Sequence, residues 1–464
     1  MIDVYRANQP GSTMANKDDE AGRDIARKLR QQIPPTGIRR DAIMDAPAFA
    51  AATLRMGAGD LQAAADIAAS LLDRYPGHPE AMFTLAMAGY WHAEQTPEAA
   101  AVAADMLERV VAARPGFAIG WYNLGFLRQR QGRDADAIAH YERCLSLDPA
   151  FVGAHVNLGN ARLWQGDIPE AIACFTRATK HPTADTLAIY NRAIAYLLTG
   201  QWVRGWQDYE TRWRTPLYRA KFPAPDLPVW DGTPPADGAR LLVFSEQGYG
   251  DTIMCARYRR TLTERFPAGV TWYVQAPLAS LLDAVPDTEP YPDADLCLPP
   301  MSLMHRLGMP ADGAPYLPRV VTADRNGRIR VGYVWAGSTT HENDARRSTD
   351  RALWDGLLAT PGVEWVDLQV GRGGTYAPAD WRETAALVGT LDLVITVDTA
   401  TAHLAGAMGV PVWILLPAMP DYRWGLASER TVWYDSARLF RQPSVGAWPE
   451  VLARVASALR EWTA

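Results

Sequence analysis

The chain has 464 residues, enough for two or three domains that each bury a core of their own. Apolar residues make up 48% of the chain and charged residues 21%, which argues against a largely disordered protein. The net charge of −6 gives no indication of a nucleic-acid partner or an anionic membrane surface. No run of about 18 apolar residues and no N-terminal signal core occurs, so we expect a cytoplasmic protein without an integral membrane segment.

The four cysteines favour a reducing compartment. Cys144, Cys174, Cys255 and Cys297 form no CxxC pair and have no histidine partner at metal-ligand spacing. Such scattered cysteines are typical of small buried side chains.

The first half of the chain repeats itself every 34 residues. Asparagine, glycine and aromatic positions recur at this spacing: Asn123, Asn157 and Asn191; Gly132, Gly166 and Gly200; Tyr141, Phe175 and Tyr209. A period of this length is typical of stacked helical hairpins. The stretch WYNLGFLRQRQGRDADAIAHYERCLSLDPA (121–150) resembles the tetratricopeptide repeat (TPR) over its full length.

The TPR resemblance predicts an α-solenoid of four to five units over residues 45–215. Gly125 and Ala137 are small enough to let two helices approach closely, and Gly132 falls in the turn between them. A weaker unit around Gly59 opens the array. Residues 1–44 form a polar N-terminal segment without recognisable chemistry.

The repeated asparagines suggest a peptide groove. Asn123, Asn157 and Asn191 occupy one position on successive first helices, which resembles the asparagine ladder of the eukaryotic O-GlcNAc transferase. An amide both donates and accepts, so it can pair with an extended backbone. The alternative is that asparagine serves the repeat structure at this position.

A proline-rich connector comes after the repeats. The last unit contains Trp206 and Trp213, expected to cap the array or dock it on the next domain. Residues 216–239 hold six prolines, so we expect an extended connector packed on the surface rather than a regular helix. A domain boundary is predicted near residues 235–240.

The second half alternates short apolar runs with helical stretches. This pattern predicts doubly wound α/β structure in two Rossmann-like lobes, in which ligands bind at the carboxyl ends of parallel strands. The predicted strands are residues 241–247, 270–275, 329–337, 363–370, 391–399 and 411–417.

Two strand-to-helix junctions carry candidate chemistry. At the first, Glu246 and Gln247 precede Gly248, Gly250 and Asp251. At the second, Asp398, Thr399 and Ala400 lead into a helix that carries His403, and free backbone N–H groups at its start suit a phosphate. The alternatives are that each aspartate caps its helix and that His403 belongs to the core. Neither junction matches a dinucleotide or ATP fingerprint.

Taken together, four stretches resemble the heptosyltransferase-like glycosyltransferases (family nine) of the GT-B class, in the branch fused to TPR units. They are SEQGYGDTIMCARY, VGYVWAGSTTHENDARRS, LDLVITVDTATAHLAGAMGVPVWILLP and DYRWGLASERTVWYDSARLFRQ. The family often has tryptophan at Tyr422. The resemblance implies an acceptor lobe at residues 240–325 and a nucleotide-sugar lobe with a terminal helix at 326–464.

The resemblance also implies an inverting, metal-independent sugar transfer. It makes Asp251 the general base, and Glu246, Gln247, Gly248 and Gly250 the loop of the acceptor lobe. It assigns donor binding to Trp335, Ser338, Arg346, Arg347, Asp398, Thr399, Ala400 and His403, leaving open which arginine of the pair contacts phosphate. Arg423, Arg438 and Arg441 have the alternative of pairing with nearby carboxylates. No metal or other cofactor is expected, and Asp293-Ala294-Asp295 is interpreted as a solvated turn in a loop between the lobes.

The expected function is transfer from a nucleotide sugar to a protein or peptide client that the TPR groove recruits. Some members of the branch resemble flagellin glycosyltransferases that use a CMP-activated nonulosonic acid, so flagellin is an implied acceptor. Two alternatives remain: sugar transfer to lipopolysaccharide or another glycan, and a non-catalytic TPR scaffold. No residue selects the base of the nucleotide.

Overall fold

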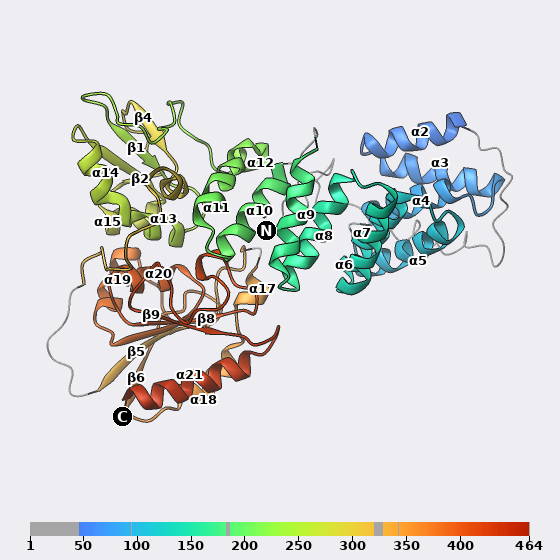
Figure 1. Ribbon diagram of the computed structural model, residues 1–464. Helices are drawn as coiled ribbons and strands as arrows, with labels where there is room; N and C mark the ends of the chain where they lie inside the picture. Colours follow the sequence, from blue (N-terminus) through green and yellow to red (C-terminus); the bar gives the residue numbers. More distant parts are fainter. Residues whose placement is uncertain (1–45, 94, 182–185, 320–327, 342, 464) are drawn as a thin grey trace. The chain divides into compact units, whose positions relative to one another are not determined.

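The computed structural model describes residues 46–93, 95–181, 186–319, 328–341 and 343–463. The predicted polar segment 1–44 lies outside them. The chain forms two compact units, and the boundary between them in the sequence falls between Arg192 and Ala193. The first is a series of helical hairpins, and the second contains two parallel sheets with helices between their strands (Figure 1). The predicted fold class, a helical solenoid followed by α/β structure, is confirmed.

The helical unit is built from antiparallel pairs that each bury one face. Small and aliphatic side chains of successive helices form a continuous core. The helices are α2 (Ala46–Gly57), α3 (Leu61–Arg74), α4 (Pro79–His92), α5 (Pro97–Ala113), α6 (Ala118–Arg130), α7 (Asp134–Leu147), α8 (Val152–Trp164) and α9 (Ile168–Thr179). Helix α10 (Thr186–Leu198) continues into the second unit.

Glycines set both the turns and the close helix contacts, as predicted. Gly132 and Gly166, between the helices of their pairs, have φ of +74° and +82°, a left-handed backbone that favours glycine. A Cβ added at Gly159 would lie 2.5 Å from the Phe175 ring of the partner helix, nearer than packed atoms can approach. The 34-residue pattern of small and aromatic residues therefore encodes the contact between the two helices of a pair.

Gly159→Val should destabilise the array, because the new side chain must displace Phe175. Overpacking of this kind costs about 1–3 kcal/mol. Gly57→Val is the matched control, since a Cβ at Gly57 meets no atom within 4 Å. Thermal unfolding followed by far-UV circular dichroism should give a lower midpoint for Gly159→Val than for Gly57→Val. Equal midpoints would contradict the packing explanation.

The first lobe of the second unit is a four-stranded parallel sheet with strand order β3-β2-β1-β4. The predicted strands at 241–247 and 270–275 are present but shorter, and β3 and β4 were not predicted. Its elements are β1 (Leu241–Phe244), α13 (Tyr249–Cys255), η3 (Ala256–Tyr258), α14 (Arg259–Arg265), β2 (Val270–Val274), α15 (Ala276–Leu282), β3 (Val285–Pro286), β4 (Leu296–Leu298), η4 (Pro300–Ser302) and α16 (Leu303–Leu307).

The second lobe is a five-stranded parallel sheet with order β6-β5-β7-β8-β9. The four strands predicted here are confirmed, whereas β9 was missed. Its elements are β5 (Ile329–Val334), α17 (Asp344–Arg347), η5 (Arg351–Trp354), α18 (Asp355–Leu358), β6 (Val363–Asp367), α19 (Trp381–Gly389), β7 (Leu393–Val397), α20 (Ala400–Ala407), β8 (Val412–Leu416), η6 (Tyr422–Trp424), β9 (Ala437–Arg441) and α21 (Trp448–Thr463).

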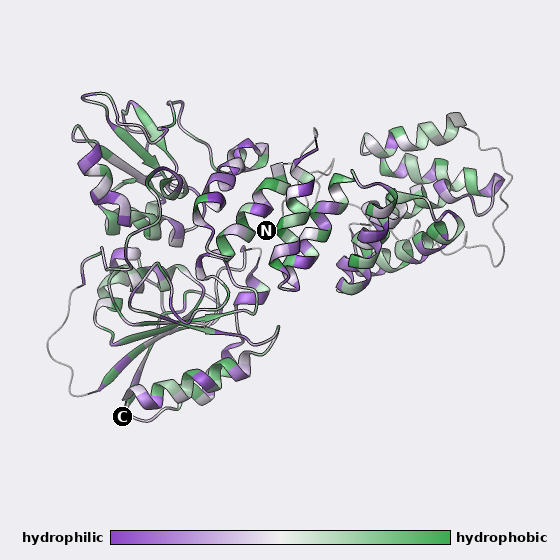
Figure 2. Ribbon diagram, in the orientation of Figure 1, coloured by the Kyte–Doolittle hydropathy of each residue, from purple (hydrophilic) through white to green (hydrophobic). Residues whose placement is uncertain are grey.

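Hydropathy agrees with this layering. Strands β7 and β8 are buried along their whole length, as expected for central parallel strands covered on both faces. Figure 2 shows apolar colour in the strands of both sheets and alternating bands on the terminal helix α21. No helix among the described residues has the length and apolar character needed to cross a bilayer.

The segment before the sheets packs into the second unit more closely than an extended connector would. Helix α11 (Trp202–Tyr209) and η2 (Glu210–Arg214) belong to this unit, where the Trp206 indole N–H lies 3.1 Å from the Met309 sulfur. Trp213 lies against Phe244 of β1, with ring centroids 5.8 Å apart. Of the two predicted roles for these tryptophans, capping the array or docking it on the next domain, the contacts favour docking.

The predicted connector 216–239 is wrong in its first part. Residues Pro216–Lys221 form helix α12, because a proline is well tolerated in the first turn of a helix. The remainder is irregular and packed as expected: Trp230 is buried, with its ring against Phe266. The compact units divide at residues 192 and 193 rather than near 235–240.

Candidate functional site

The order of the strands indicates where each lobe opens to a ligand. In the first sheet the order of strand addition reverses at β1, so that β2 and β4 lie on opposite sides of it, and in the second it reverses at β5, with β6 and β7 on opposite sides. Ligands of doubly wound sheets bind outside the carboxyl ends of the strands at such a switch point. The segments that leave β1, β5 and β7 there are residues 245–250, 335–349 and 398–400. These segments, together with the first turns of α13 and α20, carry the predicted site residues of the two lobes.

Glu246 anchors the first junction. It is buried, and both of its carboxylate oxygens accept from the Arg212 guanidinium, at 2.8 and 2.9 Å. The Met301 backbone N–H donates to it as well, at 3.0 Å. Glu246 therefore ties η2 and the segment after β4 to the end of β1, which is a structural task rather than contact with a substrate.

Gln247 turns the chain sharply toward α13. Its φ of +63° lies in the left-handed region, where residues other than glycine are uncommon and costly. Its side-chain amide donates to the Tyr209 hydroxyl at 2.6 Å, which holds the residue in this conformation. The turn delivers Gly248 as the N-cap of α13 and Asp251 in its first turn.

Asp251 has a capping role and also faces the second lobe. Its Oδ2 accepts from the Gly248 N–H at 2.9 Å, so Asp251 caps the helix from its third position, whereas the N-cap residue itself is Gly248. Its Oδ1 pairs with the Arg423 guanidinium of η6. Burial raises the pKa of the Asp251 carboxyl above its ordinary value, although Arg423 acts in the opposite direction.

Arg423 joins carboxylates of the two lobes. It is 9% exposed and lies between Asp251 of α13 and Asp421, at 2.6 Å from the latter. Its guanidinium carbon also lies 4.5 Å from the centroid of the Tyr422 ring. Despite burial, the two carboxylates keep the pKa of Arg423 well above its usual range, and Arg423 lowers the pKa of Asp421. The alternative of a carboxylate partner is thus confirmed for Arg423.

Arg438 and Arg441, for which pairing with a carboxylate was also an alternative, contact other groups than Arg423 does. Arg438 pairs with Glu429 at 3.3 Å on the surface. Arg441 donates to the carbonyl groups of Trp424 and Ser428, at 2.6 and 3.0 Å, and so holds the loop after η6.

His403 packs directly against the first junction. A Cβ at Gly250 would lie 2.6 Å from the His403 ring, so only glycine fits opposite this histidine. His403 Nδ1 lies 2.8 Å from the Tyr434 hydroxyl, and its ring stacks on Trp424. Burial, with Arg423 as a further cause, lowers the pKa of His403 to about 3. The imidazole is therefore neutral at pH 7 and acts as a hydrogen-bonding group rather than a cation.

Asp398 and Thr399 form the second junction. Burial and the neighbouring Asp421 raise the pKa of Asp398 to about 6. Thr399 is the N-cap of α20 with an extended backbone, but its hydroxyl contacts the Thr396 hydroxyl, at 3.0 Å, instead of capping the helix. The N–H groups that open α20, beginning with that of Ala400, are those that a helix start leaves without intrahelical partners.

The predicted donor residues in the loop after β5 lie in different surroundings. Arg347 donates to the Asp398 carbonyl at 2.9 Å, and its Nε atom is buried without a partner among the described residues. Arg346 and Ser338 are exposed. Of the two arginines, Arg347 is the one that reaches the end of β7.

Trp335 does not fit its predicted place at the donor. The side chain is 4% exposed and belongs to the core of the second lobe, stacked on Tyr333. Alternation along the strand turns it inward, so only its backbone borders the loop.

Two of the three repeat asparagines are buried within the helical unit. Asn157 lies 3.3 Å from the Tyr122 hydroxyl and 3.4 Å from the Tyr141 hydroxyl. Asn191 donates to the Asn160 side chain at 2.9 Å. Asn123 donates to the Ile119 carbonyl of its own helix. At Asn157 and Asn191 the amide thus stabilises the array, and in this arrangement neither lines an open groove.

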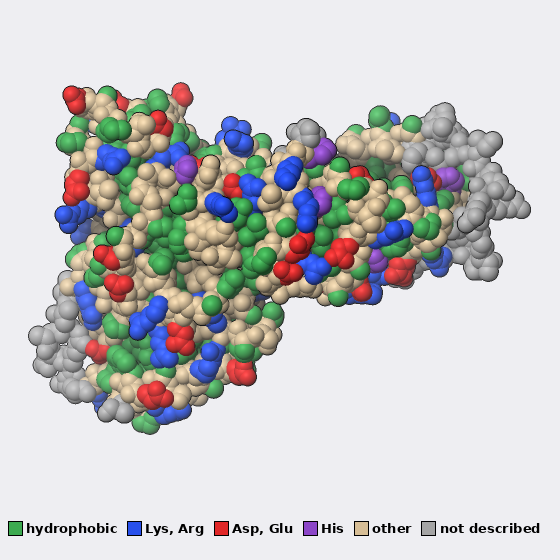
Figure 3. Space-filling model, viewed as in Figure 1, with side chains coloured by type: hydrophobic (Ala, Val, Ile, Leu, Met, Phe, Trp, Pro, Cys, Tyr) green, Lys and Arg blue, Asp and Glu red, His purple; other side chains and the backbone are tan. Residues whose placement is uncertain are grey.

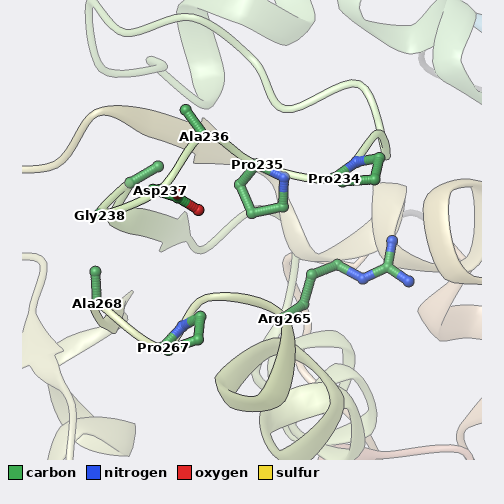
Figure 4. A pocket seen from close by; sticks show the side chains of 9 residues that line it. Pro234, Pro235, Ala236, Asp237, Gly238, Arg265, Pro267 and Ala268 are labelled. Atoms are coloured by element: carbon green, nitrogen blue, oxygen red, sulfur yellow. The ribbon is translucent and has the colours of Figure 1, made fainter.

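Neither the Asp-Ala-Asp sequence nor a hollow in the first lobe adds to the site. Asp295 accepts from the Arg240 N–H at 2.8 Å just before β4, so the turn lies within the first lobe rather than between lobes. In the described ranges no three histidine, cysteine or acidic side chains gather as a metal site would require. A hollow of about 580 Å³ is lined by the 234–239 loop, Arg265, Pro267 and Ala268 (Figure 4), and none of these is a predicted site residue.

Comparison with known proteins identifies the repeats. Models of the tetratricopeptide repeat match residues 49–105 and 118–151, so the helical unit contains TPR repeats. The chain is similar to Protein FlbA of Caulobacter vibrioides, at 29% identity over 423 residues that cover 78% of this chain and 70% of that protein.

Solved structures with similar helices include YrrB, described as a TPR protein with an unusual peptide-binding site. It has 19% sequence identity, and the match covers 41% of this chain and 90% of YrrB with a TM-score of 0.30. MamA matches at 18% identity over 37% of this chain and 97% of its own, with a TM-score of 0.31.

Asp398→Asn should stabilise the chain more at pH 7 than at pH 4. The pKa of Asp398 is about 6 in the folded chain and 3.8 ordinarily, so the folded state loses stability as pH rises through this window. Asparagine removes that loss, worth roughly 1–3 kcal/mol at pH 7. Urea unfolding at both pH values measures the change in unfolding free energy. Asp355→Asn is the control, because Asp355 is an exposed aspartate. An equal effect of Asp398→Asn at the two pH values would contradict the raised pKa.

Proposed function

We propose that the chain is an inverting, metal-independent glycosyltransferase that moves a sugar from a nucleotide-sugar donor to a protein recruited by its TPR unit. The observation that carries the proposal is the contact between the two junctions. Gly250, next to Asp251, has its Cβ position 3.4 Å from Cα of Ala400 at the start of α20. A candidate base and a candidate phosphate site are thus neighbours.

The start of α20 supports phosphate binding by the donor. N–H groups at the start of a helix and the positive end of its dipole attract an anion, and Arg347 adds a full charge beside the start of α20. Neutral His403 can donate from Nε2 when the Tyr434 hydroxyl donates to Nδ1. These groups would stabilise the negative charge that develops on the departing phosphate.

Asp251 is the proposed base. As the acceptor oxygen attacks the anomeric carbon, its proton passes to the Asp251 carboxylate, and the bond between that carbon and the phosphate oxygen breaks. The electron pair of that bond remains on the phosphate. A pKa raised by burial makes the carboxylate a better proton acceptor than an exposed aspartate.

The TPR repeats support a protein or peptide acceptor, because stacked hairpins present an extended surface to partners. On the face shown in Figure 3, positive and negative side chains of the described residues are interspersed, which suits a mixed polypeptide surface better than a polyanion. Flagellin is the first acceptor to test, with a CMP-activated nonulosonic acid as the first donor, because the resembling branch includes flagellin glycosyltransferases.

A thermal-shift screen with CMP, UDP, GDP and ADP selects the donor nucleotide by mass action. With the matching nucleotide sugar, wild-type chain should increase the intact mass of purified flagellin by one sugar residue. Asp251→Asn should lower this transfer at least about 100-fold, as loss of a general base does, while the variant still binds nucleotide.

Asp283→Asn is the matched control, since Asp283 is an exposed aspartate of the same lobe. It should retain transfer. A wild-type rate of transfer in Asp251→Asn would contradict the assignment of Asp251 as the base. Absence of a response to every nucleotide would instead favour a scaffold without catalytic activity.

A further inference from the structure

The ion pair between Arg423 and Asp251 opposes the proposed reaction, because Arg423 is bound to a carboxylate oxygen of the proposed base. Both carboxylate oxygens of Asp251 already accept a hydrogen bond, Oδ2 from the Gly248 N–H and Oδ1 from Arg423. A proton on Asp251 would also face the guanidinium at close range, which opposes proton transfer to this carboxylate. While Arg423 donates to Oδ1, the acceptor hydroxyl must compete with it for this carboxylate.

The same guanidinium lies beside the proposed phosphate site. Asp251 is next in the chain to Gly250, which abuts both His403 and Ala400 of α20. Trp424, next to Arg423 in the chain, stacks on the His403 ring with centroids 5.2 Å apart. Arg423 also keeps a buried Nε–H without a partner among the described residues. A fork of five donors can therefore serve an additional anion at this place.

The backbone of Arg423 is firmly held, so a change of partner requires only its side chain to move. Its N–H donates to Asp421 at 3.0 Å, and its carbonyl accepts from the Trp433 indole at 3.0 Å. The Tyr422 ring packs against Trp206 and Tyr209 of α11, with centroids 5.8 Å from each. The flexible three-carbon stem of the arginine is the part left to reorient.

We infer that Arg423 is a positioning residue that exchanges Asp251 for the phosphate of the donor nucleotide, so that donor binding releases the base. The inference rests on the proposed function and adds an order to it: the nucleotide sugar binds before the acceptor. Asp421 keeps its bond to Arg423 throughout and guides the movement. Before the donor arrives, Asp251 is held inactive by its ion pair with Arg423.

The test measures nucleotide affinity in a double-mutant cycle. Asp251→Asn removes the ion pair that holds Arg423, so it should bind the nucleotide selected by the screen about tenfold more tightly than wild type, an ordinary size for coupling between two sites. Cytidine, uridine, guanosine or adenosine, which lack phosphate, should bind both proteins equally. Arg423→Gln should weaken nucleotide binding and leave nucleoside binding unchanged, and Asp251→Asn should give no gain in the Arg423→Gln background. Isothermal titration calorimetry measures each affinity.

Asp283→Asn is the control for loss of a negative charge, because Asp283 is an exposed aspartate of the same lobe, and it should leave nucleotide affinity unchanged. An equal gain in that variant would overturn the exchange and indicate a general electrostatic effect. A gain from Asp251→Asn that persists without Arg423, or no gain at all, would also overturn it while leaving nucleotide binding established. If wild type and all variants bind no nucleotide, the proposed function fails and the exchange fails with it.

Discussion

The candidate site is organised around one buried cation shared by two carboxylates, Arg423 between Asp251 and Asp421. Removing charges from water is expensive, and removing one partner of such a pair costs about 3–5 kcal/mol because the other charge is left uncompensated. The three groups come from both lobes, so their pairing requires α13 and η6 to stay together. The arrangement makes the junction stable without a ligand and, in the proposal, makes the donor's phosphate a competitor for the same guanidinium.

The surrounding packing serves this requirement. Gly250 has no side chain because the His403 ring fills the space where one would lie. Burial keeps His403 neutral, so the positive charge near the start of α20 is supplied by Arg347 and Arg423. The strained Gln247 is held by the Tyr209 hydroxyl, which places α13 at the angle that brings Asp251 to Arg423.

The fold was largely predictable because its signals are periodic. The 34-residue period marks helix contacts such as that of Gly159 with Phe175, and apolar runs mark the buried central strands. Strand β9 was missed because two arginines interrupt its short apolar run at the edge of the sheet, and β4 because only three residues form it. The site was predictable in its two junctions, but not in its partners. Burial of Trp335 and the pairing of Arg423 with Asp251, 172 positions earlier in the chain, depend on tertiary packing.

The proposed mechanism depends on a nucleotide phosphate that binds at the start of α20 and takes Arg423 from Asp251. A crystal structure of the wild-type chain with the nucleotide that stabilises it most would reveal this exchange. We predict a phosphate oxygen within hydrogen-bond reach of the Ala400 N–H and of Arg423, with Arg423 and Asp251 separated by more than ~4 Å. A bound nucleotide with the Arg423–Asp251 pair intact, or a nucleotide bound away from α20, would contradict the mechanism.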